Sequence, residues 1–287
     1  MSRWLRSIQW NAFRAANIAV RACRRMAGLG DVAVIRRGGL YWELNLSETI
    51  DFSIYLTGSF QRATLEALVG MLREGDTVLD IGANMGAMAL PAARAVGPQG
   101  KVICIEPTVF GTRKLRRNLE LNNDLLGRIE IRQLELVDQA GATPHATMYA
   151  RWPIGRAKGR HAGHHGVAED CAGTATITLD EFCAADRLAK IDGVKLDVDG
   201  NECGVLRGAR RTLEAFRPWI IVELQPSAFG TREPDRFEDM IDLMRKAGYQ
   251  LYDLDRRLQL PMEALRLRRL LPGDAVLNAV ALYGAAP

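Results

Sequence analysis

An aspartate and two closely spaced glycines follow an apolar run near residue 80. Residues 78–86 read VLDIGANMG, so Asp80 lies two positions before Gly82 and six before Gly86. Gly82 lets the backbone approach a ligand without a Cβ atom in the way, and Gly86 permits close packing where a helix starts. The spacing differs from the Gly-x-Gly-x-x-Gly motif that binds the pyrophosphate of dinucleotides, where a nearby anion is unfavourable. The aspartate instead favours a ligand with a cationic ammonium or sulfonium group.

A second acidic residue follows the next apolar run. Glu106 comes directly after residues 101–105 and lies 24 positions after Gly82. An acid at the end of the second strand of an open α/β sheet is placed to bind both hydroxyls of a ribose. A solvated surface glutamate is the alternative, but the apolar run that leads into Glu106 argues against it. The order of strand, glycine turn, helix, strand and acid predicts an adenosine-type cofactor.

A third group of ionisable residues surrounds residue 197. Residues 195–202 read KLDVDGNE, and side-chain alternation along a strand would point Lys195, Asp197 and Asp199 to one face. Glu223 ends the next apolar run in the same way. These carboxylates could position an acceptor hydroxyl, take its proton or hold a divalent cation. A structural Lys–Asp pair beside a helix cap is the alternative interpretation.

Short apolar strands alternate with helices from residue 75 onwards. We predict strands at 77–81, 101–105, 129–137, 194–198, 218–223, 249–254 and 276–283. We predict helices at about 85–96, 109–121, 201–216 and 235–247. This alternation predicts a mostly parallel sheet with helices on both faces, in which the last two strands could form an antiparallel edge. Residues 138–176 interrupt the alternation, and we expect a hairpin and loop there, near the mouth of the site.

The first 30 residues differ in charge from the rest of the chain. They hold six arginines and no acid, so the other 32 basic and 34 acidic residues sum to −2. At 100° per residue, residues 3–26 form a two-sided helix with the arginines on one side, and Gly28 and Gly30 end it. The apolar side holds Trp4, Leu5, Ile8, Ala12, Ala15, Ala19, Ala22 and Met26. Such a helix could lie on an anionic membrane, dock on a partner, cap its own domain or serve as a targeting segment.

The composition is that of an ordinary globular protein, with 48% apolar and 25% charged residues. No apolar run approaches the ~18 residues of a membrane span. The five scattered cysteines predict neither a zinc site nor disulfides and fit a reducing compartment. We therefore expect a cytoplasmic protein that could contact the inner membrane surface through residues 3–26, and no nucleic-acid partner. We expect a basic helix at 1–30, an appendage at 31–74 with short strands over 32–58 and a helix near 60–73, and a main domain at 75–287.

With several further blocks, these motifs make the chain similar to the FkbM-type family of S-adenosylmethionine-dependent methyltransferases. The resemblance covers about residues 58–225. The blocks, in order, are 75–76, 79–86, 106–107, 117–122, 178–182, 195–200, 217–218 and 220–223. The resemblance implies a Rossmann-like class I methyltransferase fold with a seven-stranded sheet. It also implies methyl transfer to an oxygen of a small-molecule or glycan acceptor, often a sugar, glycolipid or secondary metabolite.

The resemblance also implies roles for individual residues. Residues 80–86 would hold the methionine end of the cofactor, Glu106 the ribose, and residues 135–138 would border the adenine. The candidate cofactor-binding residues are Asp80, Gly82, Ala83, Asn84, Gly86, Glu106, Pro107, Glu135 and Asp138. The candidate catalytic residues are Asp197, which would lie beside the transferring methyl group, Asp199 and Glu223. Two blocks depart from the family pattern: residues 198–202 have Asp199 where a glutamate is usual, and residues 58–61 end in a glutamine in place of a glutamate.

The implied reaction is a direct displacement, with Asp197 or a histidine of the HAGHH segment at 161–165 as the base. A solvated loop is the alternative for those histidines. Three other functions stay open. The position of Asp80 argues against an oxidoreductase. The absence of an aromatic residue beside Asp197 argues against a nucleic-acid base methyltransferase. A membrane-docked scaffold without activity is the third.

Overall fold

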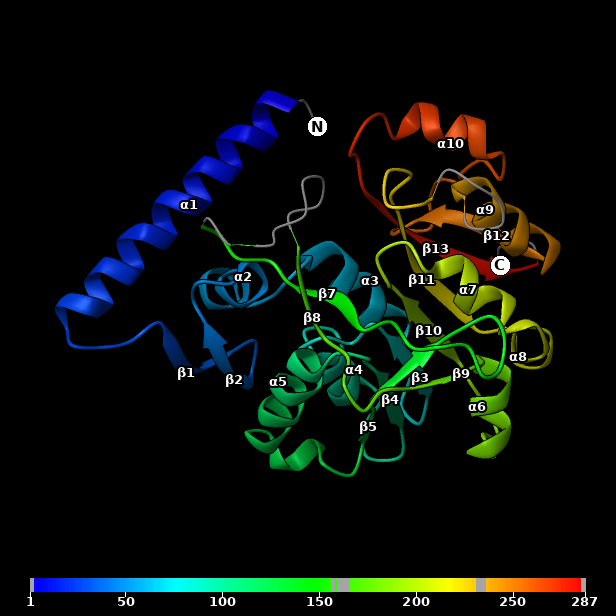
Figure 1. Cartoon of the computed structure of the whole chain (residues 1–287), viewed down its shortest axis with the longest axis horizontal. Coiled ribbons are helices and arrows are strands. Elements are labelled where there is room, and N and C mark those ends of the chain that lie inside the picture. Colours follow the sequence, from blue (N-terminus) through cyan, green and yellow to red (C-terminus); the bar gives the residue numbers. More distant parts are fainter. Residues whose placement is uncertain (1–2, 156–157, 159–165, 231–235, 285–287) are drawn as a thin grey trace.

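A seven-stranded sheet forms the centre of the molecule (Figure 1). The computed structural model describes residues 3–155, 158, 166–230 and 236–284, with side chains from residue 9 on. Its strands are β3 (Thr77–Ile81), β4 (Lys101–Ile105), β5 (Ile129–Arg132), β10 (Gly193–Leu196), β11 (Trp219–Leu224), β12 (Tyr249–Asp253) and β13 (Leu277–Tyr283). Their order is β12-β13-β11-β10-β3-β4-β5, and β13 runs antiparallel to both of its neighbours. The mostly parallel sheet is confirmed, and so is its antiparallel edge, which β12 and β13 form with β12 outermost.

Hydrophobic side chains cover both faces of this sheet. Val78 and Val102 belong to one buried cluster, and their neighbours Leu79 and Ile103 belong to a second one. Because successive strand residues point to opposite faces, the two clusters lie on opposite sides of the sheet. The covering helices are α4 (Ala89–Ala95), α5 (Val109–Glu120), α6 (Leu179–Ala185), α7 (Glu202–Arg207), α8 (Arg210–Phe216), α9 (Phe237–Lys246) and α10 (Ala264–Leu270). A short 3₁₀ turn, η1 (Asn123–Leu125), follows α5.

Three predicted elements of the main domain differ from the structure. The predicted strand at 129–137 splits, because β6 (Leu134–Leu136) leaves the main sheet and pairs with β9 (Ala175–Ile177). The predicted helix at 201–216 is divided into α7 and α8 around Gly208, where a Cβ atom would lie 2.2 Å from the Val137 carbonyl oxygen. The helix predicted from residue 85 begins only at Ala89, because the preceding turn contains left-handed backbone.

Residues 32–71 form a hairpin and two helices. The hairpin, β1 (Val32–Arg37) and β2 (Leu40–Asn45), turns at Gly38 and Gly39, and its strands confirm the short strands predicted there. The helices are α2 (Thr49–Thr57) and α3 (Arg62–Met71). The prediction of strands over 32–58 is therefore wrong for residues 49–57, which form a helix. Leu44 of β2 and Phe52 of α2 are fully buried in the cluster that also holds Val78 and Leu90 of the main domain.

The N-terminal helix α1 (Arg3–Met26) lies along one side of the molecule, next to α2 (Figure 1). Phe13 packs edge-to-face on Phe52, with ring centroids 5.0 Å apart. The buried Asn17 donates a hydrogen bond from Nδ2 to the Leu46 carbonyl oxygen at 2.6 Å. Arg21 forms an ion pair with Asp31 at 2.5 Å. The helix thus caps its own domain with one side. Among the described residues no helix has the length and apolar content needed to cross a membrane.

The insertion predicted at 138–176 contains a hairpin, as expected. Strands β7 (Thr147–Arg151) and β8 (Val167–Asp170) pair in the antiparallel direction. The histidine segment at 161–165, one candidate for the base, lies outside the described residues.

Candidate functional site

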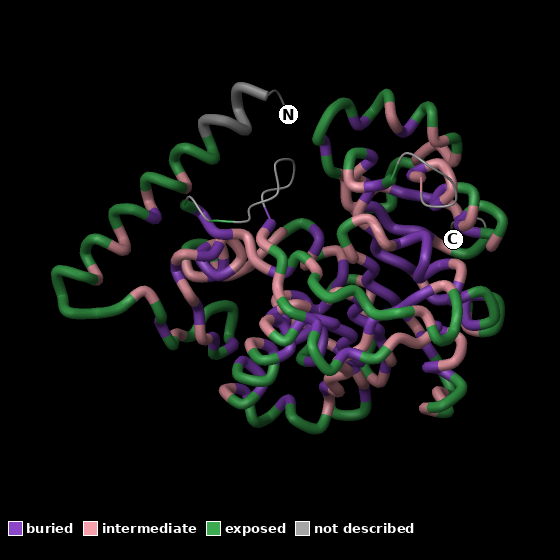
Figure 2. Tube along the Cα trace, in the orientation of Figure 1, coloured by how far each residue is buried: buried purple, intermediate pink, exposed green. Residues whose placement is uncertain are grey.

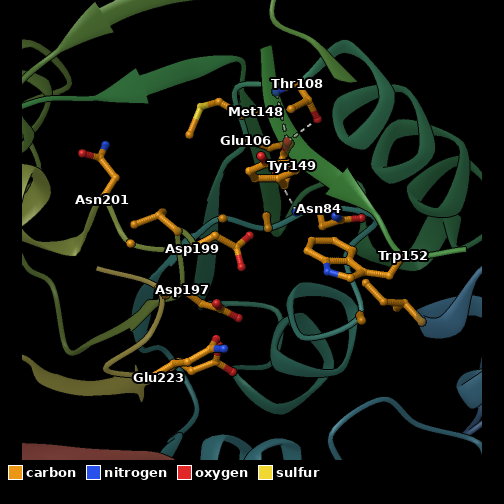
Figure 3. Close-up of a pocket in the computed structure, with 18 of the residues that line it drawn as sticks. Asn84, Glu106, Thr108, Met148, Tyr149, Trp152, Asp197, Asp199, Asn201 and Glu223 are labelled. Carbon is orange, nitrogen blue, oxygen red and sulfur yellow. Dashed lines mark hydrogen bonds between the residues drawn. The ribbon is translucent and has the colours of Figure 1, made fainter. Parts of the chain in front are cut away.

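A cavity of about 690 Å³ opens beyond the carboxyl ends of β3, β4, β10 and β11 (Figure 3). This is where ligands bind in open α/β sheets, and the volume is in the range of small-molecule sites, ~300–1,000 Å³. The predicted residues that line it are Gly82, Ala83, Asn84, Glu106, Pro107, Asp197, Asp199 and Glu223. Four predicted residues do not line it, namely Asp80, Gly86, Glu135 and Asp138.

The glycine turn after β3 brings two strand ends into contact. Gly82 has a φ of +80°, and a Cβ atom there would lie 1.9 Å from the Asp197 carbonyl oxygen. Asn84 is also left-handed, at +47°, and its Nδ2 donates a hydrogen bond to the Ala150 carbonyl oxygen at 2.9 Å. Gly86 lies outside the cavity because it packs on Leu90 and Leu115, which matches its predicted packing role. The turn is therefore held in place by Asp197, directly after β10, and by Ala150 of the insertion.

Glu106 is buried at the end of β4 and is held by the same turn. Its Oε2 accepts a hydrogen bond from the Asn84 backbone N–H at 2.8 Å, and its Oε1 accepts one from the Thr108 N–H at 3.0 Å. The Thr108 hydroxyl also donates to Oε1. Burial raises the pKa of Glu106, although these hydrogen bonds oppose the shift. A carboxylate offers about four acceptor positions, so this one keeps capacity for a ligand hydroxyl.

Lys195 connects the turn to the carboxylates. Its Nζ donates a hydrogen bond to the Gly82 carbonyl oxygen at 2.8 Å and lies 3.4 Å from Asp80 Oδ1 and 3.5 Å from Asp197 Oδ2. Burial lowers the pKa of Lys195, but the two aspartates outweigh that effect and raise it overall. Burial raises the pKa of Asp80. The cation that Asp80 faces in the structure is thus Lys195, which itself lines the cavity.

Three carboxylates converge on one side of the cavity (Figure 3). Strand β10 ends at Leu196 and Asp199 has a φ of +52°, so strand alternation does not place Asp199 as the sequence predicts. Asp199 still reaches the cavity through this left-handed turn, beside Asp197 and Glu223. Burial and then the charge of Asp197 raise the pKa of both Asp199 and Glu223. Burial also raises the pKa of the neighbouring Glu202, to about 7.

The two residues predicted near the adenine are engaged by protein groups. Glu135 is buried and accepts a hydrogen bond from the His145 backbone N–H at 2.9 Å, and its Oε1 also contacts the His145 ring. Asp138 forms an ion pair with Arg207 at 3.3 Å. His145 itself lines the cavity, so Glu135 could act there only through that ring. The adenine roles of Glu135 and Asp138 stay predictions.

Part of the cavity wall is aromatic, which the sequence did not predict. Its aromatic residues are Trp10, Phe60, Tyr149 and Trp152. Figure 3 shows the Trp152 ring across the cavity from Asp197 and Glu223. Trp10 belongs to α1 and Trp152 follows β7, so both rings line the cavity only because these two segments dock beside it. Within the described ranges, no group of three or more His, Cys, Asp or Glu side chains is arranged to hold a metal ion.

One known protein family matches the chain in sequence. The family model described as "Methyltransferase FkbM domain" matches residues 80–251, more than half of the chain. No curated protein matches in sequence. Many solved structures resemble the chain distantly, and three of them follow.

The first is the methyltransferase FkbM from Methylobacillus flagellatus, 17% identical with a TM-score of 0.47; the match covers 78% of this chain and 48% of that one. This chain thus spans about half the length of that relative. A SAM-dependent O-methyltransferase from Thermotoga maritima is 14% identical with a TM-score of 0.42, and the match covers 92% and 82% of the two chains. TYW2 from M. jannaschii, in complex with AdoMet, is 14% identical with a TM-score of 0.42 and coverages of 88% and 84%. By the family match, the chain belongs to the FkbM family of S-adenosylmethionine-dependent methyltransferases.

Proposed function

We propose that this protein transfers a methyl group to a hydroxyl oxygen of a sugar, a glycolipid or a secondary metabolite. S-adenosylmethionine supplies the methyl group, carried on a positively charged sulfonium. The observation that carries the proposal is the single cavity where the Gly82 turn, Glu106 and the carboxylates of Asp197, Asp199 and Glu223 meet. Lys195 is the one lysine or arginine among the described lining residues, against five acids. A cavity of this sign attracts a cationic ligand.

The aromatic wall favours a sugar as the acceptor. An aromatic ring such as that of Trp152 offers a flat apolar surface, while the carboxylates opposite it accept hydrogen bonds from hydroxyls. Sugars present an apolar C–H face and several hydroxyls at once, so both walls would be satisfied together. A nucleic acid fits less well, because the chain beyond residue 30 has a net charge of −2.

The proton of the acceptor hydroxyl would pass to Asp199 or Glu223. A carboxylate is a more effective general base when its pKa is raised toward the working pH, as burial and Asp197 do for both groups. Asp197, in its ion pair with Lys195, would supply the charge that keeps them basic. The remaining contribution of the site is to hold the hydroxyl in line for attack.

Glu106→Ala tests the cofactor site directly. We expect the affinity for S-adenosylhomocysteine to fall about 10- to 100-fold, the effect of losing charged hydrogen bonds worth ~1.5–3 kcal/mol. Isothermal titration calorimetry measures it, and Glu66→Ala on the exposed surface of α3 is the control. Unchanged affinity in a folded Glu106→Ala protein would remove the proposed ribose contact. Failure of the wild-type chain to bind S-adenosylhomocysteine would reject the function as a whole.

The raised carboxyl pKa values predict a distinctive pH dependence. The base must be deprotonated, so we expect the methylation rate to increase with pH through a midpoint well above the ~4 of an ordinary carboxyl group. Asp199→Asn should lower the rate about 100-fold or more if Asp199 is the base. The measurement is transfer of labelled methyl to an acceptor found by screening glycan and polyketide hydroxyls. A midpoint near ~4 would show that neither raised carboxyl group is the base.

A further inference from the structure

One side of α1 carries a continuous, uncharged and mostly apolar strip that faces solvent. Its residues are Asn11, Ala12, Ala15, Ile18, Ala19, Ala22, Cys23 and Met26, and all of them are exposed (Figure 2). We call this set the outward strip. Ile18 is 66% exposed and Met26 is 81% exposed. No charged residue interrupts the strip, which spans most of the helix.

The domain cannot use the outward strip, because the other side of α1 already packs against it. Phe13 and Val20 pack on the hydrophobic cluster around Phe52, and Asn17 is buried by its hydrogen bond to Leu46. Trp10, also on that side, lines the cavity. The helix is therefore fixed in rotation about its own axis. Because the opposite side of α1 packs on the domain, the outward strip points away from the protein.

The charges beside the strip indicate what it contacts. Arg14 and Arg25 lie four residues before and seven residues after Ile18, so they border the strip on the helix surface. Both are exposed, and Arg25 keeps 63% of its side chain accessible although it lies 3.4 Å from Asp31. The first 30 residues contain six arginines and no acid. An apolar strip bordered by arginines is the pattern of a helix that lies in the interface of an anionic bilayer.

We propose that the outward strip of α1 docks this protein on a bilayer surface that contains anionic lipids. A second copy of the chain is a poorer occupant, because two strips in contact would bring the two arginine-rich helices together without any acid between them. Anionic headgroups pair with Arg14 and Arg25, while Ile18 and Met26 enter the apolar boundary beneath them. The docking requires neither cofactor nor acceptor and is independent of methyl transfer.

Co-sedimentation of the full chain with vesicles tests the proposal. The probes are vesicles of phosphatidylglycerol with phosphatidylcholine, and vesicles of phosphatidylcholine alone. We expect binding to the anionic vesicles at least about tenfold tighter than to the neutral ones, and weaker binding as salt increases. The double variant Ile18→Glu/Ala22→Glu should lose about tenfold or more of this affinity, and Arg14→Ala should weaken it less.

The control is Leu126→Glu, which places one glutamate on an exposed leucine beyond η1, away from the outward strip. It should bind vesicles as the wild type does. S-adenosylhomocysteine titration of every variant verifies a folded site and tests the methyltransferase proposal separately. Failure of the wild type to sediment with anionic vesicles, or equal sedimentation of the Ile18→Glu/Ala22→Glu variant, would overturn the docking. A dimer in solution that the double variant dissociates would assign the strip to a second copy.

Discussion

Lys195→Met is expected to lower the free energy of unfolding by about 3–5 kcal/mol, the cost of removing one partner from a buried ion pair. The Lys195 ammonium lies within 3.5 Å of both Asp80 and Asp197, and Asp80 is almost fully buried. Methionine keeps an unbranched apolar side chain at this position but leaves Asp80 without a cation. The hydrogen bond to the Gly82 carbonyl oxygen is lost as well. Urea unfolding of the variant and the wild type measures the difference.

Two further variants show whether charge causes the effect. Asp80→Asn combined with Lys195→Met removes both charges and should recover part of the loss, because the uncompensated carboxylate is gone. Lys190→Met breaks a pair with Asp192 at 2.8 Å in which the lysine is 49% exposed, and it should cost at most about 1 kcal/mol. Equal effects for Lys195→Met and Lys190→Met would contradict a structural role for the buried pair.

Gly82→Ala is expected to reduce S-adenosylhomocysteine affinity about 100-fold, as a displacement of ~1 Å at a binding site can. The new Cβ atom would lie 1.9 Å from the Asp197 carbonyl oxygen, which is backbone and cannot rotate away. The turn or the end of β10 must therefore move, and both line the cavity. We also expect a loss of stability, from left-handed strain of about 1–2 kcal/mol and overpacking of about 1–3 kcal/mol. Calorimetric titration and urea unfolding measure the two effects.

Gly75→Ala is the matched control for this substitution. Gly75 has nearly the same backbone conformation, with a φ of +84°, but a Cβ atom there would meet nothing within 4 Å. It should show only the backbone strain of about 1–2 kcal/mol and unchanged ligand affinity. If both alanine variants bound S-adenosylhomocysteine like the wild type, the contact between Gly82 and Asp197 would have no part in the site.

The strands that position the site could be predicted because they are buried on both faces. Residues 77–81 and 101–105 are short, mostly apolar runs, and both are strands with those bounds. The helix at Thr49–Thr57 was mistaken for a strand because Ile50, Phe52 and Ile54 alternate with polar residues. Its Asp51 carboxylate accepts a hydrogen bond from the Asn45 N–H and pairs with Lys114. The partner Lys114 lies 63 residues away in the sequence, so the local pattern around Asp51 does not predict this contact.

The same distinction applies to the site. The convergence of Glu106, Asp197 and Glu223 follows from the rule that parallel strands end at one edge of a sheet. The contact between Asp80 and Lys195 required the register of β3 against β10, in which these two residues are paired. The aromatic wall depends on how α1 and the insertion dock on the main domain. The spacing of residues in the sequence does not predict that docking.

The position of β13 has a consequence for how the molecule is synthesised. Residues 277–283 lie between β11 and β12, so both of these strands must wait for a partner that leaves the ribosome after them. Until then the nascent chain presents unpaired backbone on two apolar strands, a template for aggregation. A stop codon shortly before residue 277 would remove an internal strand and leave such a protein to chaperones and proteases.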